Sequence, residues 1–253
     1  MLYFIYDNTF EGLLTAIFDA YNRKEFPDRI VDSDYSIPLF TENHLVTSDI
    51  EKSDRVLKGL RKKISKSALN MLFVCYLSEI EDIEMILFRY IQKALSSPIS
   101  IEMNFADDDV LMLSKIYKKV INETTHIKQF VRFQKTTDGI YFAVMDPLYN
   151  VLPLCSNFFE DRYADQQWIL YDSRRHYGLF YNLEKTEIIH FENPSLSLKT
   201  GQLAYESMDE QELAFQNLWN DYLKAVTIQE RKNLKLQRQF MPKRFWKYLI
   251  EKR

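Results

Sequence analysis

The chain has 253 residues, of which 46% are hydrophobic and 27% are charged, and its formal net charge is -3. This length and hydrophobic content suffice for a folded core, which excludes an intrinsically disordered chain. The longest apolar run, residues 71–77, is far shorter than the ~20 residues needed to cross a bilayer. Because the net charge is small, any nucleic-acid or membrane surface must come from local clustering of charge.

The N-terminus and the cysteines indicate a protein of the reducing cytoplasm. Residues 1–7 have neither a basic leader nor a long apolar stretch, so we expect no secretion signal. Cys75 and Cys155 lie in apolar surroundings, which predicts two reduced, buried thiols. Two cysteines and four scattered histidines provide no ligand set for zinc or an iron–sulfur cluster, so we expect no metal and no cofactor.

In chain order, the first half predicts one strand followed mainly by helices. Residues 2–6 alternate like a short strand, and residues 7–9 offer a cap for an amphipathic helix that ends before Pro27. Residues 27–47 have the texture of an irregular connection. A helix is also expected from residues 107–109, where three aspartates suit the positive helix end. Further helix starts are expected where Ser or Thr precedes Glu by three residues, at Ser48, Ser78, Ser207 and Thr227.

From about Gln129 the texture changes to short β-type runs, at 130–133, 140–145, 168–171, 177–181 and 187–191. Asp138-Gly139 is a hairpin signal, and residues 148–163 are expected to be partly helical. The predicted fold class is α+β: a small, mostly antiparallel sheet of about five or six strands with surrounding helices, in a single domain. Its parts are 1–128, mainly helical after the first strand, 129–192, the sheet region, and 207–253, the C-terminal helices.

Positive charge gathers at the end of the chain. From Thr227 onward nine lysines and arginines stand against two glutamates, a local balance of 9 − 2 = +7. Cations interleaved with aromatic rings suit contacts to phosphates and stacking on bases. The alternative is a solvated helix face whose rings fill the core. A second basic run lies at 55–66, and the candidates for nucleic-acid binding at the C-terminal end are Arg231, Lys235, Arg238, Lys243, Arg244, Trp246 and Lys247.

A pair of polar residues near the end of one predicted helix is a candidate for acid/base chemistry. Glu123 and His126 are three residues apart and share a helix face, which suits a catalytic pair but equally suits capping or hydrogen bonding. Arg132 follows in the predicted strand 130–133, either on the wet face of the sheet or in a functional pocket.

The densest polar segment of the chain is 168–178, at the junction of two predicted strands. Arg174 and Arg175 suit bidentate binding of a phosphate, with Asp172 orienting one of them. The alternative is an Asp–Arg pair that only stabilises the turn. The sequence has no nucleotide-binding loop, serine-hydrolase or zincin motif, so whether the chain is an enzyme stays open.

Four stretches together resemble a bacterial family: YDNTFEGLL (6–14), ExxHxxxFVRF (123–133), WILYDSRRHYG (168–178) and MPKRFWKYL (241–249). Its members are assigned to DNA metabolism or DNA repair, stand alone or fused to a uracil-DNA-glycosylase-like domain, and accompany a DNA modification or repair radical SAM protein. The likeness runs nearly end to end. The family pattern has His-Phe where this chain reads Phe158-Phe159, before Arg162, so an activity that depends on that histidine is in question here.

The resemblance and the basic clusters favour a DNA-directed accessory protein, which holds nucleic acid while the radical SAM partner acts on it. Two alternatives stay open. One is an enzyme that acts on a nucleotide or nucleobase; its pocket would contain His126, Glu123, Arg132 and Asp172. The other is a protein-interaction subunit that binds the partner and never touches DNA.

Overall fold

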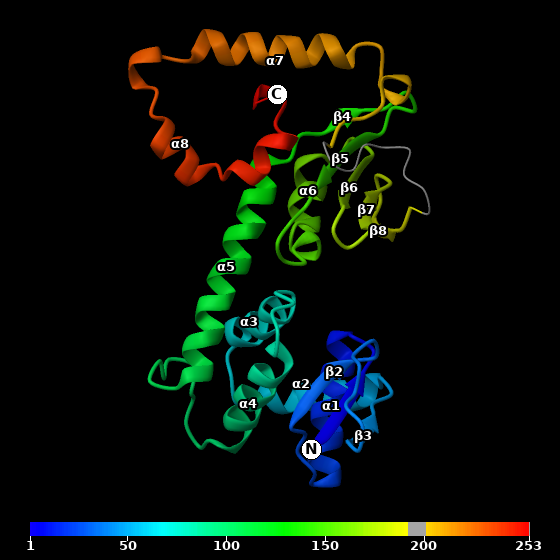
Figure 1. The fold of residues 1–253 in the computed structure, drawn as a ribbon, viewed down its shortest axis with the longest axis vertical. Helices are drawn as coiled ribbons and strands as arrows, with labels where there is room; N and C mark the ends of the chain where they lie inside the picture. The colour runs from blue at the N-terminus through cyan, green and yellow to red at the C-terminus, as the bar shows by residue number, and fades with distance from the viewer. Residues whose placement is uncertain (192–200, 253) are drawn as a thin grey trace. The chain divides into compact units, whose positions relative to one another are not determined.

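The computed structural model describes residues 1–191 and 201–252, which divide into two compact units, Met1–Ile121 and Asn122–Arg253 (Figure 1). Each unit has its own sheet. The boundary falls within helix α5 (Asp108–Phe130), which Asp107 caps by accepting hydrogen bonds from the backbone N–H groups of Asp109 and Val110. The single domain expected from the sequence stays a prediction, since compact units can fold together or separately.

The N-terminal unit is built on a parallel sheet with the strand order β2-β1-β3. Its strands are β1 (Leu2–Tyr6), β2 (Arg29–Asp32) and β3 (Glu42–Leu45). The predicted strand over 2–6 is confirmed, but the prediction of an irregular connection over 27–47 is wrong. Both missed strands have only four residues, and parallel partners lie far apart in sequence, so no local pattern marks them.

Besides the first part of α5, this unit contains four helices: α1 (Phe10–Arg23), α2 (Ile50–Leu60), α3 (Lys66–Tyr76) and α4 (Ile83–Ser96). Thr9 caps α1 as expected, by accepting from the backbone N–H of Gly12. The Asp7 carboxylate accepts hydrogen bonds from the hydroxyls of Thr9 and Ser48 beside this turn. A Cβ at residue 12 would crowd Asp7 Oδ1 and Ser48 Oγ, so a larger residue there would have to displace these side chains.

The helices begin later than the Ser/Thr-x-x-Glu pattern predicts. Asp49 rather than Ser48 caps α2, α4 begins only at Ile83, and α7 (Glu212–Val226) begins after Gln211. Residues beyond Thr227 form a 3-10 turn, η3 (Gln229–Arg231), and then α8 (Leu234–Phe240), which Asn233 caps. The pattern therefore marks the region of each helix start but not the first residue.

The C-terminal unit contains a five-stranded sheet in sequential order: β4 (Gln134–Lys135), β5 (Tyr141–Met145), β6 (Trp168–Asp172), β7 (Tyr177–Tyr181) and β8 (Thr186–Ile189). The pairing of β5 with β6 is parallel and the others are antiparallel, so this predicted sheet is present but mixed. The parallel crossover runs through η1 (Leu152–Leu154) and α6 (Ser156–Arg162), and α6 lies beside β5 and β6 (Figure 1).

The predicted strand over 130–133 is wrong, because α5 continues through Phe130. The Phe130 ring stacks on His126, one turn earlier, with ring centroids 5.7 Å apart, and it also contacts Phe245. These contacts bury Phe130 as part of the helix end. Arg132 therefore lies between the helix and β4 rather than in a strand.

The chain ends in short helical segments: η2 (Tyr205–Ser207), α7, η3, α8, η4 (Lys243–Tyr248) and η5 (Ile250–Lys252). Gln134 in β4 ties this region to the sheet, since its side-chain amide donates to the backbone carbonyl of Gly201 at 2.6 Å. Within the described ranges, no helix has the length and apolar character needed to cross a bilayer.

Two glycine substitutions should have opposite effects on stability. Gly12→Ala forces the new methyl group into the Asp7–Thr9–Ser48 hydrogen-bond group and should lower the free energy of unfolding by roughly 1–3 kcal/mol. Gly59→Ala, within α2, meets only Leu95 at 3.6 Å and should raise it by about 0.5–1 kcal/mol. Urea unfolding of both variants measures this, and equal effects at the two sites would contradict the proposed crowding.

Candidate functional site

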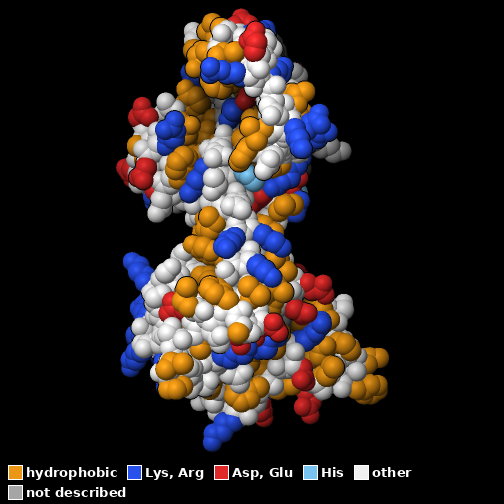
Figure 2. Space-filling model, turned by 90° about the vertical axis from the view of Figure 1, so that its left-hand side faces the viewer, with side chains coloured by type: hydrophobic (Ala, Val, Ile, Leu, Met, Phe, Trp, Pro, Cys, Tyr) orange, Lys and Arg blue, Asp and Glu red, His pale blue; other side chains and the backbone are white. Residues whose placement is uncertain are grey.

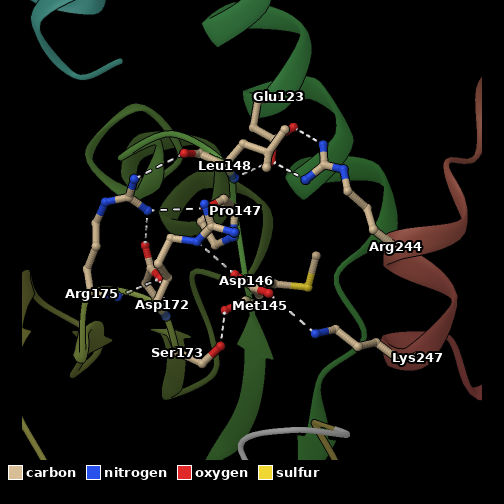
Figure 3. Close-up of polar contacts among 11 residues, drawn as sticks. Glu123, Met145, Asp146, Pro147, Leu148, Asp172, Ser173, Arg175, Arg244 and Lys247 are labelled. Atoms are coloured by element: carbon tan, nitrogen blue, oxygen red, sulfur yellow. Dashed lines mark hydrogen bonds and ion pairs between the residues drawn. The ribbon is translucent and has the colours of Figure 1, made fainter. Parts of the chain in front are cut away.

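Polar side chains gather where β5 and β6 end. Because these two strands are parallel, their carboxyl ends meet at one edge of the sheet, a place where ligand sites are commonly built. Asp146 follows β5 directly, and Asp172 is the last residue of β6. We call these side chains the strand-end cluster; its charged members are Glu123, Asp146, Asp172, Arg175, Arg244 and Lys247, which Figure 3 labels, and Arg174, which donates to Asp146.

Asp172 holds the turn after β6. Its carboxylate is fully buried and accepts from the backbone N–H groups of Arg174 and Arg175, at 2.8 and 3.1 Å, and from Arg175 Nη1 at 2.9 Å. Burial raises the pKa of Asp172 above its ordinary value, while the hydrogen bonds from Arg175 act in the opposite direction. The guanidinium of Arg175 also donates to the backbone carbonyls of Pro147 and Leu148. This geometry matches the turn-stabilising alternative for Asp172 and Arg175.

Glu123 connects three segments of the C-terminal unit. This side chain is 3% exposed, and its carboxylate accepts from the backbone N–H of Leu148 at 2.8 Å. Both of its oxygens also accept hydrogen bonds from the guanidinium of Arg244, which comes from η4 (Figure 3). A bidentate arginine–carboxylate pair fixes orientation as well as distance. Glu123 therefore fastens both the turn after β5 and the C-terminal segment to α5.

Asp146 is a member of the cluster that sequence reasoning missed. Its carboxylate accepts from Arg174 Nε at 3.1 Å and from Lys247 Nζ at 3.4 Å. A carboxylate directly after a buried strand and before Pro147 is the signal that marks it. With Asp146 included, the cluster has four cations and three carboxylates, a balance of 4 − 3 = +1, so most of its charge is neutralised internally.

His126 and Arg132 lie outside this hydrogen-bonded group. His126 Nδ1 is 3.9 Å from Glu123 Oε2, and it is buried without a hydrogen-bond partner in the described part of the chain. Arg132 instead donates to Glu251 at 2.7 Å, and its guanidinium lies over the ring of Trp219. Of the predicted catalytic residues, Glu123 and His126 therefore lie side by side, and Asp172 lies on the other side of the 147–148 turn from Glu123. Arg132 is bonded to Glu251 instead. Their catalytic roles stay predictions.

Apart from Trp246, the remaining predicted nucleic-acid ligands lie in residues 231–243, which we call the cationic segment. It contains no Asp or Glu, and its five cations are exposed and form no ion pair with any residue that the structure describes; they are Arg231, Lys232, Lys235, Arg238 and Lys243. In Figure 2, the C-terminal unit at the top carries Lys and Arg side chains around hydrophobic side chains that border a hollow.

Trp246 and the basic run 55–66, two further candidates for nucleic-acid binding, make contacts with other parts of the chain. The Trp246 indole donates to the backbone carbonyl of Met241 at 3.0 Å, and Lys252 lies over its ring. In the basic run 55–66, Arg55 lies over the ring of Phe18, and Lys63 donates to the carbonyl of Ser97. No group of three or more potential metal ligands exists among the residues described.

These features define an α/β protein whose C-terminal unit joins a mixed sheet, an ion-paired strand edge and a cation-rich helical tail. The chain belongs to DUF4130, a family of domains of unknown function, whose model matches residues 81–251. Among solved structures, the pGpG-specific phosphodiesterase PggH from Vibrio cholerae is 12% identical, with 90% of this chain and 100% of that chain covered and a TM-score of 0.33. A likeness at this level carries no conclusion about fold or function. No curated protein matches the chain.

Loss of the Glu123 charge should destabilise the C-terminal unit. Glu123→Gln keeps an acceptor for Leu148 but leaves Arg244 without its carboxylate, so we expect a loss of roughly 2 kcal/mol in the free energy of unfolding. Glu187→Gln is the control, since it removes an exposed pair with Lys185 and should cost less than about 0.5 kcal/mol. Chemical unfolding compares them, and a Glu123→Gln effect as small as the control would argue against the fastening role.

Stability should also depend on pH through His126. Burial lowers the pKa of His126 below its ordinary value, Glu123 opposes this shift and Arg244 reinforces it. The unfolded chain then takes up a proton near pH 6.5, before the folded chain does, so this contribution to stability is present above that pH and is lost as the pH falls. In His126→Phe the free energy of unfolding should fall less between pH 7.5 and 5.5 than in the wild type. Urea unfolding at several pH values measures this, and the same dependence on pH in both proteins would contradict the prediction.

Proposed function

We propose that this chain is a nucleic-acid-binding accessory protein of DNA metabolism, working in the cytosol. In this proposal the cationic segment holds the nucleic acid while a separate enzyme, the radical SAM protein implied by the family resemblance, performs the chemistry. The observation that carries the proposal is the run of five exposed cations in 231–243, which lacks any carboxylate of its own. Cations with few acidic neighbours attract phosphates more strongly, because fewer carboxylates compete for them.

The two groups of predicted DNA ligands contribute differently to this proposal. Arg244, Lys247, Arg174 and Arg175 are bonded to carboxylates of the strand-end cluster, so a phosphate would have to displace those partners. The cations of the cationic segment have no such partner in the described chain. We therefore assign most of the phosphate contacts to Arg231, Lys235, Arg238 and Lys243.

The enzyme alternative has less support from the geometry. A general base needs a carboxylate or imidazole that reaches a substrate proton. Glu123 and Asp172 are buried, and their oxygens are already engaged by arginine and backbone N–H groups. Either carboxylate would have to break these bonds before it could act on a substrate.

The interaction-subunit alternative is favoured by one specific observation, the exposed apolar residues of α7. It differs from the leading proposal in a simple respect, because an interaction subunit that never touches DNA would not retain short DNA on its own. Binding experiments on the isolated chain therefore separate the two.

Binding of short DNA to the full chain should be strongly salt-dependent and should need the cationic segment. The triple variant Arg231→Ala/Lys235→Ala/Arg238→Ala removes up to three phosphate contacts, so the slope of log K against log salt should become shallower by about 2–3. Fluorescence anisotropy with a labelled oligonucleotide at several salt concentrations measures the slope.

The matched control is Lys115→Ala/Lys118→Ala/Lys119→Ala, which removes the same charge from exposed positions of α5. This control should bind like the wild type. Equal loss of binding in both triple variants, or affinity that hardly changes with salt, would remove the physical basis of the proposal.

A further inference from the structure

Helix α7 carries an apolar stripe that the described chain leaves uncovered. Five residues recur at helical spacing on one face, and each keeps between 38% and 64% of its surface exposed; they are Phe215, Leu218, Trp219, Tyr222 and Val226. On the apolar face of α4, by contrast, Leu87 and Ile91 are at most 1% exposed. An apolar surface of this kind on a folded helix marks an interaction site.

Trp219 is the stripe residue that contacts its own unit, through Glu251 of η5 and the guanidinium of Arg132, whereas the other four keep more than half of their surface exposed. At its N-terminal end Glu212 accepts from the backbone N–H of Lys135, and near its middle the Trp219 indole donates to Glu251 at 3.2 Å. The rings of Trp219 and Tyr222 stack on one another, with centroids 5.8 Å apart. Among the described elements of this unit, the short 3-10 helix η5 lies beside the middle of α7, and no α-helix lies along it (Figure 1).

We propose that α7 pairs with α7 of a second copy of this chain, with the two helices antiparallel. This inference does not depend on nucleic-acid binding. Twofold pairing of identical surfaces is the commonest route to a soluble oligomer. In an antiparallel arrangement the positive end of each helix dipole lies beside the negative end of the other, which is electrostatically favourable.

The charge pattern around α7 fits this occupant. Acidic residues precede and open the helix, whereas mostly basic residues close and follow it, so antiparallel copies bring unlike charges together and parallel copies bring like charges together. The acidic end has Glu206 and Glu210, besides Asp209, which pairs with Lys135, and the buried Glu212; the basic end has Arg231, Lys232 and Lys235 with Glu230 among them, besides Lys224, which pairs with Asp221. The acidic end makes α7 itself unsuitable for a phosphate backbone.

The stripe is symmetric about its centre as well. Phe215 and Tyr222 lie at equal distances in sequence from the midpoint between Leu218 and Trp219. A twofold axis at that midpoint places Phe215 of one copy opposite Tyr222 of the other, so an aromatic ring meets an aromatic ring on each side of the axis.

Oligomeric state tests the proposal directly. Analytical ultracentrifugation of the full chain should give a concentration-dependent monomer–dimer equilibrium with a dissociation constant on the order of 10 µM. Leu218→Glu, at the centre of the stripe, should raise the dissociation constant by at least about 30-fold. Asn217→Glu introduces the same charge at an exposed position on the opposite face and should leave the equilibrium unchanged.

Cysteine cross-linking tests the orientation. Leu218→Cys lies beside the proposed axis, so two copies should form a disulfide on oxidation, whereas Phe215→Cys lies about 10 Å from its equivalent and should not. The native Cys75 and Cys155 are buried, and burial raises the pKa of each thiol to about 12, so they do not compete.

Three outcomes would overturn the proposal. A wild-type chain that stays monomeric up to ~100 µM excludes self-association through a specific interface of this size. A dimer that Leu218→Glu leaves intact places the interface elsewhere, provided that circular dichroism shows the variant folded. Equal cross-linking at residues 215 and 218 means a parallel pair. Arg231, Lys232 and Lys235 belong to both proposals, so the readouts separate them: Leu218→Glu should weaken dimerisation and leave these cations in place for DNA, which the anisotropy measurement tests.

Discussion

The ion pair between Glu123 and Arg244 is the contact on which the arrangement of the C-terminal unit depends. It joins residues 121 positions apart, and the same carboxylate accepts the backbone N–H of Leu148. One buried side chain thus holds the end of α5, the turn after β5 and the segment η4 in a common position. Because the charge of Glu123 is almost wholly removed from water, its partners are needed for it to be buried at all.

This fastening also determines where positive charge is available. The arginines and lysines that pack against the strand ends form ion pairs with Glu123, Asp146 and Asp172. The cations of α8 and its neighbours come from a part of the sequence without carboxylates, so they stay open to solvent. The division between structural and available cations follows from which carboxylates each one can reach.

The sequence predicts local features of this fold well and distant ones poorly. The strands at 141–145, 168–172 and 177–181 follow from alternating β-branched and aromatic residues, and the Thr9 cap of α1 follows from its neighbours. Strands β2 and β3 were not predicted because they are stabilised by parallel pairing with β1, and the residues around them in sequence give no sign of this pairing. The run at 130–133 reads as a strand, but Phe130 ends α5, where it contacts Phe245 from far along the chain, and residues 131–133 are irregular.

The candidate site likewise has residues that local sequence predicts and contacts that it does not. Glu123, Asp172, Arg174 and Arg175 were identifiable from residue type and position at element ends, yet their partners were not, since an ion pair depends on which segments meet after folding. Asp146 could have been found from its place after a strand. Glu251, which binds both Arg132 and Trp219, has no such signal, because only the return of the C-terminus toward α7 gives it those neighbours.

The position of the cationic segment shortly after α7 has a consequence for how strongly a long nucleic-acid strand could be held. If two copies meet through α7, each assembly presents two cationic segments, joined by a fixed protein frame rather than by a flexible tether. The second segment then meets a strand already bound by the first at a high effective concentration, so modest affinities multiply. A polymer long enough to reach both segments would be retained far better than a short one of the same composition.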